Sequence, residues 1–333
     1  MLRLPPFRYH RPRTIDDAVG LLDRWGRRAL PVSGGTDLIP NMKHRLFTPD
    51  HLIALKQIPD MRGFRRDGSA LVIGGAETLA SVARHPEVRR RFPSLAAAAG
   101  QVAGPQLRNM GTLGGNICLD TRCTYYNQTE FWRDALGYCL KKDGNVCHVT
   151  RVGKKCVAAH SADTPPVLMT LGATIELAGP EGRRDVGLND FFLADGIWNS
   201  RRKPGEIVTR VRIPFPSRDS RAAYTKLRQR RSIDFPLLSV AVSADFQRSG
   251  RVCQIMGVVT ALGARPRLLT GWARIALGRA LSNEVVEALA ERAHRQCHPL
   301  ENAIVDADWR RAMVPVQVRL ALEALRPSAA SAS

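Results

Sequence analysis

Residues 111–164 read GTLGGNICLDTRCTYYNQTEFWRDALGYCLKKDGNVCHVTRVGKKCVAAHSADT, and the rest of the chain is interpreted around this stretch. It opens with a glycine-rich loop, ends in the pattern of a helix start, and holds five of the seven cysteines, four of them at 123–156. The segment at about 119–158 shows neither the 3.6-residue nor the 2.0-residue apolar period of a packed helix or strand. A loop of that length is expected to be functional or disordered. Four sulfurs around a metal centre would order it.

The spacing of these four cysteines excludes several familiar metal sites. Cys123, Cys139, Cys147 and Cys156 are separated by gaps of 15, 7 and 8 residues. No C-x-x-C pair of a zinc finger or ribbon occurs, and no ferredoxin-type run. Four thiolates can bind a structural zinc or hold an iron–sulfur cluster, and unrelated free cysteines are the third interpretation. The spacing alone leaves all three open.

The remaining cysteines are expected to have other roles. Cys118 lies inside the glycine-rich loop on a constrained backbone and is left out of the ligand set. Cys253 and Cys297 fall in an expected strand and an expected helix, where core packing is the usual role.

Composition and charge narrow the class of protein. The 333 residues are 44% hydrophobic and 24% charged, which is ordinary for a globular protein of more than one domain. No apolar run approaches the ~18 residues of a membrane span, and the N-terminus shows no secretory signal, so a cytoplasmic location is expected. The formal charge of +20 would suit nucleic acid, an anionic membrane or an acidic protein partner. The basic residues are spread along the chain, which disfavours nucleic acid.

Two glycine-rich loops are candidates for binding phosphate. Residues 29–32 predict a buried strand, and the loop Ser33-Gly34-Gly35-Thr36-Asp37 follows before an expected helix. Such a turn frees the backbone to approach a ligand and presents N–H groups to an anion. Taken alone, a tight strand-to-helix turn explains the pattern equally well. The loop at 111–116 has the same character, and two such loops together suit a pyrophosphate.

Other elements follow from periodicity and turn residues. A helix is predicted from residue 15 to 25, with Thr14 as N-cap; Thr78 is expected to cap a later helix, and Ser282 or Asn283 another. The run Pro214-Phe215-Pro216 is the candidate domain boundary. Beyond it, a hairpin is expected at 237–247 and 252–261, and a last helix at 308–325 is expected to bend or break at Pro315. The tail at 327–333 is expected to be disordered.

Four segments carry a resemblance to a known family. PVSGGTDLIPNMK, MGTLGGNI, HSADTPPVL and YTKLRQRRSIDFPLLSVAV resemble the FAD-binding subunits of molybdenum hydroxylases. That family includes xanthine dehydrogenase and the carbon monoxide dehydrogenase medium subunit. The resemblance covers essentially the whole chain and implies an α+β fold. Residues 1–216 would form a two-part FAD-binding domain of the PCMH/vanillyl-alcohol-oxidase type, and residues 222–326 a smaller α+β C-terminal domain.

The cysteine-rich insertion resembles a narrower group. Most family members pass almost directly from the second glycine-rich loop to the helix start near Asp163. An insertion at about 119–158 with four cysteines is similar to that of the beta subunits of 4-hydroxybenzoyl-CoA reductases, in which the loop holds a [4Fe–4S] cluster. The resemblance therefore favours a cluster over zinc, with the four cysteines of the insertion as ligands.

The resemblance also implies the residues of an FAD site. Asp163 matches an acidic residue near the ribityl and flavin region, and Lys226 matches a lysine near the isoalloxazine ring. Ile207 and Val208 match apolar positions against the ring. From the residues alone, Asp163 would be a helix cap and Lys226 a solvated strand lysine. The residues implied for the pyrophosphate are Ser33, Gly34, Gly35, Thr36, Asp37, Thr112, Gly114, Gly115 and Asn116.

The implied function is electron entry into a molybdenum enzyme, and no catalytic acid or base is assigned to this chain. In a dimer of heterotrimers, reduced ferredoxin would pass electrons through the [4Fe–4S] cluster and FAD to a small subunit with [2Fe–2S] clusters. A large molybdopterin subunit would then reductively dehydroxylate 4-hydroxybenzoyl-CoA to benzoyl-CoA, a step of anaerobic aromatic degradation. One alternative is the FAD subunit of another molybdenum hydroxylase, acting on a different aromatic compound or an aldehyde. An alternative of another class is a zinc-stabilised, basic nucleic-acid-binding protein.

Overall fold

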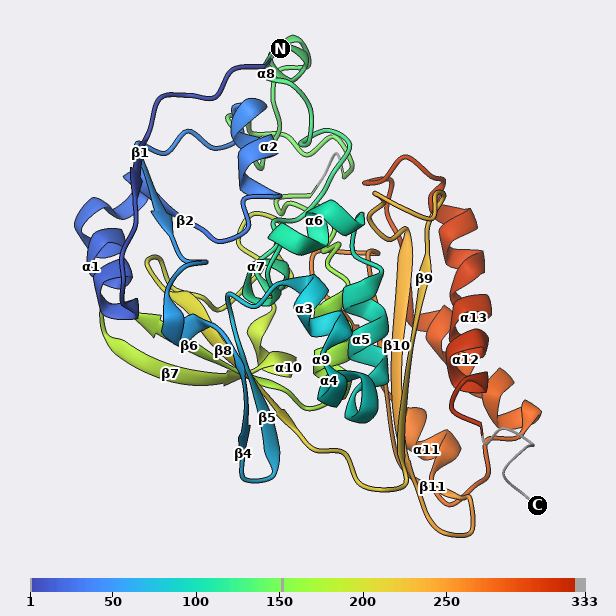
Figure 1. Ribbon diagram of the computed structural model, residues 1–333. Coiled ribbons are helices and arrows are strands. Elements are labelled where there is room, and N and C mark those ends of the chain that lie inside the picture. The colour runs from blue at the N-terminus through green and yellow to red at the C-terminus, as the bar shows by residue number, and fades with distance from the viewer. Residues whose placement is uncertain (1, 151–152, 327–333) are drawn as a thin grey trace.

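The computed structural model describes residues 2–150 and 153–326 and contains three separate β-sheets (Figure 1). A three-stranded and a five-stranded sheet form a two-part first domain, and a four-stranded sheet with helices forms a smaller second domain. The predicted α+β class is confirmed. The tail expected to be disordered lies outside the described residues.

The N-terminal part is a parallel sheet in the order β1-β3-β2, from Arg8–His10, His51–Ala54 and Ala29–Val32. Helix α1 (Ile15–Trp25) packs its apolar face against this sheet. The Thr14 hydroxyl accepts a hydrogen bond from the Asp17 amide at 3.0 Å, so the predicted N-cap is confirmed. The first glycine-rich loop follows β2 and leads directly into α2 (Leu38–Lys43).

The second part of the first domain is an antiparallel sheet in the order β4-β5-β8-β6-β7. Its strands come from distant parts of the sequence, because seven of the described helices lie between β5 and β6. The strands are β4 (Phe64–Asp67), β5 (Ala70–Gly74), β6 (Thr174–Gly179), β7 (Gly182–Gly187) and β8 (Ile207–Pro214). The helices are α3 (Leu79–Arg84), α4 (Pro86–Arg91), α5 (Pro93–Gly100), α6 (Pro105–Met110), α7 (Leu113–Ile117), α8 (Glu130–Ala135) and α9 (Thr164–Thr170). Short turns η1 (Gly26–Arg28) and η2 (Pro59–Met61) and helix α10 (Leu188–Phe191) complete this domain.

The second domain is an antiparallel sheet in the order β12-β11-β10-β9. Helices α12 and α13 cover one face, and α5 and α9 of the first domain approach the other, so the sheet lies between two helical layers (Figure 1). Tyr224, Ala241 and Val258 belong to the core of the first domain, which joins the two domains through apolar contact. The strands are β9 (Ser220–Leu227), β10 (Leu238–Phe246), β11 (Val252–Thr260) and β12 (Arg267–Leu268), and the helices are α11 (Trp272–Ala276), α12 (Asn283–Gln296) and α13 (Ala307–Glu323).

Two local expectations need correction. Helix α13 continues through Pro315, so of the predicted bend or break the break is wrong; Val314 and Val318, on either side of the proline, are fully buried in the core of the second domain and hold the helix there. The cysteine-rich insertion is not entirely irregular, because it contains the short helix α8, capped by Thr129. None of the described helices combines the length and apolar character needed to cross a membrane.

Candidate functional site

A cleft of about 620 Å³ lies where the two parts of the first domain meet, beside a loop of the second domain. Both glycine-rich loops line it, as do the end of β2 and the start of β8. The loop at 233–235, which belongs to the second domain, lines it as well. The cleft thus collects segments that are far apart in the sequence.

The two glycine-rich loops contact each other through their backbones. A Cβ atom added to Gly34 would lie 2.2 Å from the Met110 carbonyl oxygen, and one added to Gly114 would lie 2.8 Å from the Gly75 carbonyl oxygen. Backbone atoms cannot yield in the way that a flexible side chain can. The Thr112 hydroxyl also donates to the Ser33 hydroxyl at 3.0 Å. Glycine is therefore required here for close packing between loops, in addition to any approach to a ligand.

Side chains of the second loop fix its shape. The Thr112 hydroxyl accepts from the Gly115 amide at 3.2 Å, at the start of α7. The Asn116 side-chain oxygen accepts from the amide and the hydroxyl of Thr164, at 3.1 and 2.6 Å. These side chains hold the loop in place, and the backbone amides at 113–116 all donate within the protein, so they are not free to donate to a ligand.

Asp163 and Lys226 form a fully buried ion pair, with 2.9 Å between Nζ and Oδ2. The Tyr224 hydroxyl donates to the other carboxylate oxygen at 2.5 Å. Burial raises the pKa of Asp163, and burial lowers the pKa of Lys226, while each partner's charge opposes the shift of the other. Asp163 starts α9 but its side chain makes no capping bond, so it is no ordinary helix cap. Asp163 lines the cleft, whereas Lys226 lies behind it and is not part of the lining.

The other residues implied for the cofactor also lie at the cleft. Ile207 and Val208 line it at the start of β8, and the residues of the first loop line the opposite side. Five lining residues carry buried polar atoms that have no partner among the described residues: Nδ1 of His44, Oδ2 of Asp120, Nε of Arg122, Nδ2 of Asn127 and Nδ2 of Asn199. Close-packed glycines, an apolar wall and free hydrogen-bonding groups together fit a dinucleotide such as FAD.

Asp37 has a role that the sequence did not predict. It occupies the N-cap position of α2, yet its side chain makes no capping bond. Its carboxylate instead pairs with the guanidinium of Arg122, which also lies over the ring of Phe235, 4.6 Å from the centroid. Arg122 begins the cysteine-rich insertion, and burial lowers its pKa to about 10. The ion pair therefore ties the insertion to the first glycine-rich loop.

The four cysteines of the insertion line one small, separate cavity. Cys139, Cys147 and Cys156 are buried, Cys123 is partly exposed, and all four are free thiols. The Cys156 sulfur accepts a hydrogen bond from the Ala158 amide at 3.4 Å, and burial raises its pKa to about 11. Cys118 lines the larger cleft instead.

The thiols around this cavity are not arranged for a single metal ion. Among the described residues, no three His, Cys, Asp or Glu side chains are grouped closely enough to hold one. His148 lines the cavity, but its Nε2 is 2.6 Å from the Tyr138 carbonyl oxygen, which gives it a structural partner. His160 is buried against Thr260, at 2.7 Å between Nδ1 and the hydroxyl.

Residues outside the predicted site hold the insertion in place. The Asn302 side chain, from the loop before α13, donates to the Val157 carbonyl oxygen at 2.7 Å, and the Asn302 backbone carbonyl oxygen accepts from the Thr124 amide at 3.2 Å. Arg133 in α8 is buried and donates to the His44 carbonyl oxygen at 2.9 Å. Both contacts join segments distant in sequence, and no local pattern marks them.

Comparisons with known proteins agree with this geometry. A family profile described as the FAD binding domain in molybdopterin dehydrogenase matches residues 5–216. A second profile, the CO dehydrogenase flavoprotein C-terminal domain, matches residues 222–325. The chain is 33% identical over 321 residues to the carbon monoxide dehydrogenase medium chain of Hydrogenophaga pseudoflava, covering 96% of this chain and 97% of that protein. It is 25% identical to the nicotinate dehydrogenase FAD-subunit of Eubacterium barkeri, covering 89% and 88%.

A solved structure extends the agreement to three dimensions. Carbon monoxide dehydrogenase from Hydrogenophaga pseudoflava, in a form lacking the Mo-pyranopterin moiety, aligns with a TM-score of 0.80 and 31% identity. The alignment covers 97% of this chain and 98% of that one. The chain belongs to the FAD-binding medium subunits of the xanthine dehydrogenase and carbon monoxide dehydrogenase family of molybdenum hydroxylases.

Proposed function

We propose that this FAD-binding subunit is the electron-entry subunit of a molybdenum enzyme of the 4-hydroxybenzoyl-CoA reductase type. The observation that carries the proposal is that four cysteines of one insertion line one cavity, next to the cleft that fits FAD. Cys123, Cys139, Cys147 and Cys156 would hold a [4Fe–4S] cluster. The two glycine-rich loops, Asp163, Ile207 and Val208 would hold FAD, with Lys226 behind Asp163 as its buried counter-charge.

The choice of a cluster over zinc rests on the resemblance of the insertion. Four thiolates can bind either group. Among the described residues, no three His, Cys, Asp or Glu side chains form a group that could hold a metal ion. The zinc-stabilised nucleic-acid-binding alternative predicts bound zinc, so the metal content of the purified protein distinguishes the two.

The cluster would transfer one electron at a time, and FAD would transfer one or two. This chain's residues bind and position them. Three of the four thiols are buried, which limits access of water to the centre. The amide of Ala158 donates to the Cys156 sulfur, and hydrogen bonds to sulfur are one determinant of a cluster's potential.

The partners belong to the same proposal. We expect a large molybdopterin subunit and a small [2Fe–2S] subunit in a dimer of heterotrimers, with ferredoxin as electron donor. The charge of +20 would favour docking of an acidic ferredoxin. A transfer rate that does not change with ionic strength would count against that docking. A cytoplasmic location is included, because free thiols persist in a reducing compartment.

The proposal is tested by the metal content of the anaerobically purified protein. We expect a yellow-brown preparation with FAD and about four irons per chain. Cys139→Ser should lose the iron and the cluster absorbance while FAD stays bound, because Cys139 lines only the cysteine cavity. Cys253→Ser is the matched control, since that thiol is exposed on β11, and it should keep both. Bound zinc, or unchanged iron in Cys139→Ser, would refute the assignment.

A second candidate is an FAD subunit of another molybdenum hydroxylase. Its support is the range of relatives, which includes an aldehyde oxidoreductase FAD-binding subunit from Escherichia coli at 33% identity over 230 residues. Assays of the complete complex with 4-hydroxybenzoyl-CoA and with aldehydes would distinguish the two, because substrate choice is expected to lie in the large subunit.

A further inference from the structure

The cysteine cavity and the flavin cleft are separated by a wall only one or two segments thick. Arg122 lines the cleft and the next residue, Cys123, lines the cysteine cavity. On the segment that follows the insertion and pairs with Arg122, Ala158 lines the cavity and Ser161 lines the cleft. The backbones of these two segments pair, with amide-to-carbonyl distances of 2.8 and 2.7 Å between Arg122 and Ala159.

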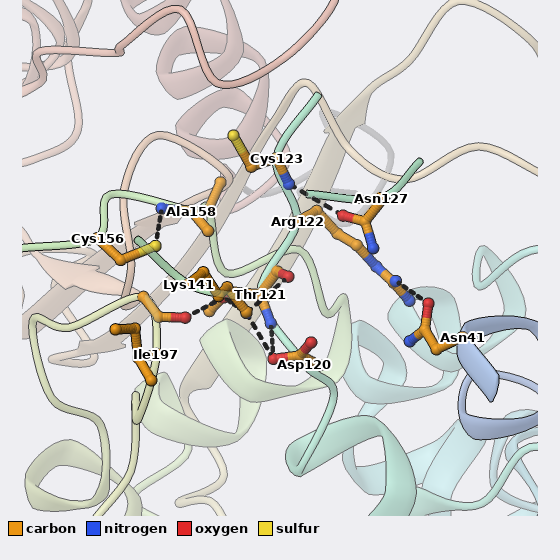
Figure 2. A network of polar contacts seen from close by, with 12 residues as sticks. Asn41, Asp120, Thr121, Arg122, Cys123, Asn127, Lys141, Cys156, Ala158 and Ile197 are labelled. Atoms are coloured by element: carbon orange, nitrogen blue, oxygen red, sulfur yellow. Dashed lines mark hydrogen bonds and ion pairs between the residues drawn. The ribbon is translucent and has the colours of Figure 1, made fainter. Parts of the chain in front are cut away.

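An ion pair between a buried lysine side chain and a partly exposed carboxylate crosses this wall. The Lys141 ammonium lies 2.7 Å from Oδ1 of Asp120 and 3.2 Å from the Thr121 carbonyl oxygen, and it also donates to the Thr121 hydroxyl (Figure 2). Lys141 lines the cysteine cavity, whereas Asp120 lines the flavin cleft. The positive end of the pair therefore faces the thiols and the negative end faces the cofactor cleft.

The ammonium is held rigidly and away from water. Only 4% of the Lys141 side chain is exposed, and its Nζ lies 4.3 Å from the centroid of the Tyr126 ring. The neighbouring Lys142 differs, because its side chain is 30% exposed and pairs with Asp143. Two adjacent lysines thus give a buried and a partly exposed side chain for comparison.

One oxygen of the Asp120 carboxylate meets no hydrogen-bond donor among the described residues, although the Tyr126 hydroxyl lies near the same carboxylate. Oδ1 of Asp120 accepts from Lys141 and from the Thr121 amide, at 2.7 and 2.9 Å. Oδ2 is buried and has no partner among the described residues. A buried carboxylate oxygen left unsatisfied is costly, so a donor from a molecule in the cleft would stabilise it.

We propose that the Asp120–Lys141 pair is the electrostatic link between the two redox sites of this subunit. The ammonium stabilises an electron added at the cysteine centre, and the free oxygen of Asp120 accepts a hydrogen bond from the dinucleotide. The inference rests on the cluster in the proposed function. One electron, supplied by a one-electron donor protein, enters the centre without bond cleavage or proton transfer, so the change there is one unit of negative charge.

The two charges predict opposite effects on the cluster potential. Replacing Lys141 by methionine removes positive charge beside the centre, and the reduced state is destabilised. Replacing Asp120 by asparagine removes negative charge while the ammonium stays, and the reduced state is stabilised. Simple damage to the loop would not move two variants in opposite directions. The sign of the shift therefore separates electrostatic tuning from a structural role.

The test is an anaerobic redox titration of the purified holoprotein, followed by electron paramagnetic resonance of the reduced cluster. Iron and FAD are measured first. A wild-type protein without iron refutes the proposed function itself, before any variant is compared. In Lys141→Met we expect the equilibrium constant for reduction to fall about tenfold, or about 59 mV for one electron. Asp120→Asn should shift the potential upward, and Lys142→Met should leave it close to that of the wild type.

Two further measurements keep the proposal open to refutation. If Lys141→Met loses iron, Lys141→Arg, which keeps the charge, should retain the cluster and a potential near the wild-type value. Asp120→Asn should also weaken FAD binding roughly tenfold, as expected when a charged acceptor is lost. A downward shift in Asp120→Asn, equal shifts in Lys141→Met and Lys142→Met, or unchanged FAD affinity in Asp120→Asn would overturn the proposed link.

Discussion

The flavin cleft and the cysteine cavity lie on opposite sides of one wall, yet they are built in different ways. The cleft is shaped by backbone, because its glycine-rich loops approach each other more closely than a Cβ atom would allow. The cysteine cavity is shaped by side chains on an insertion with little regular structure, which Asn302 and Arg133 hold in place. A site made of backbone restricts residue size, whereas a site made of side chains restricts residue chemistry.

This difference predicts how each site responds to substitution. At the cleft, adding a single methyl group should harm both the fold and cofactor binding, because the loops are part of the domain's packing. At the cavity, changes should affect the metal centre while the flavin stays bound. Substitutions placed on each side of the wall can break or sharpen this contrast.

The largest effect is expected behind the cleft, in Lys226→Met. In the wild type the Lys226 ammonium lies 2.9 Å from Oδ2 of Asp163. The substitution leaves the Asp163 carboxylate buried without that counter-charge. Breaking one partner of a buried pair costs about 3–5 kcal/mol, and this pair joins the two domains. Urea unfolding of the purified subunit at pH 7 should show that loss, whereas Lys142→Met, at an exposed lysine, should change stability by less than about 0.5 kcal/mol.

The deficit of Lys226→Met should depend on pH. Burial already raises the pKa of Asp163 in the folded protein, and removal of Lys226 takes away a charge that lowers it. A carboxyl whose folded pKa is raised binds a proton more readily when folded, so the folded state gains stability as pH falls. The deficit relative to wild type should therefore shrink between pH 7 and pH 4. A deficit that stays constant or grows would contradict the assignment of Asp163 as the stranded charge.

The next largest effect is expected in the first glycine-rich loop, in Gly34→Ala. The new Cβ would lie 2.2 Å from a backbone oxygen and 2.7 Å from the Cα of Gly111. Overpacking of this kind costs about 1–3 kcal/mol, and the separated loops should lose FAD. Flavin absorbance after gel filtration and the unfolding free energy measure both effects.

Gly20→Ala is the matched control for that change. Gly20 is exposed in α1, and a Cβ there would have nothing within 4 Å. It should stabilise the subunit by about 0.5–1 kcal/mol, because glycine is a poor helix former. Retention of FAD by Gly34→Ala would show that the loops are less tightly constrained than their packing indicates.

The contrast also explains what the sequence could reveal. A site built from close-packed backbone leaves a local mark, since pairs such as Gly34-Gly35 and Gly114-Gly115 are visible wherever they occur. Caps and hairpins leave similar marks, and Thr14, Thr78 and Ser282 were predicted as caps and are confirmed. The order of strands in the five-stranded sheet has no such mark, because β5 pairs with β8 across more than a hundred residues.

Side-chain geometry was beyond the reach of the sequence for a related reason. The cysteines were identifiable by type, but their convergence depends on tethers such as Asn302, which follows Cys156 by more than a hundred residues. Lys226 was expected from its pattern to be solvated, yet it is fully buried, because the first domain supplies both Asp163 and the Gln101 carbonyl oxygen as partners. Such partners are set by the tertiary fold.

A smaller effect is expected on the cavity side of the wall, in Gly196→Ala. The added Cβ would lie 2.6 Å from the Cys156 sulfur and 2.8 Å from the Ala158 amide nitrogen. The sulfur must move, so bound iron should fall to less than half, with stability reduced by about 1 kcal/mol and FAD retained. Gly263→Ala, which meets nothing within 4 Å, should keep full iron content. Equal loss of iron and FAD in Gly196→Ala would mean that the two sites do not respond separately.

The smallest effect is expected on the outer face of the insertion, in Phe131→Ser. Phe131 is 84% exposed in α8, whereas Arg133, two residues on, is buried and tied to His44. Since the insertion is held by its inward side chains, removal of an outward ring should change the unfolding free energy by no more than about 0.5 kcal/mol. Iron and FAD content should match those of the wild type. A loss above about 1 kcal/mol, or reduced iron, would mean that the outer face of α8 also supports the cavity, and the contrast would then have to include surface packing of the insertion.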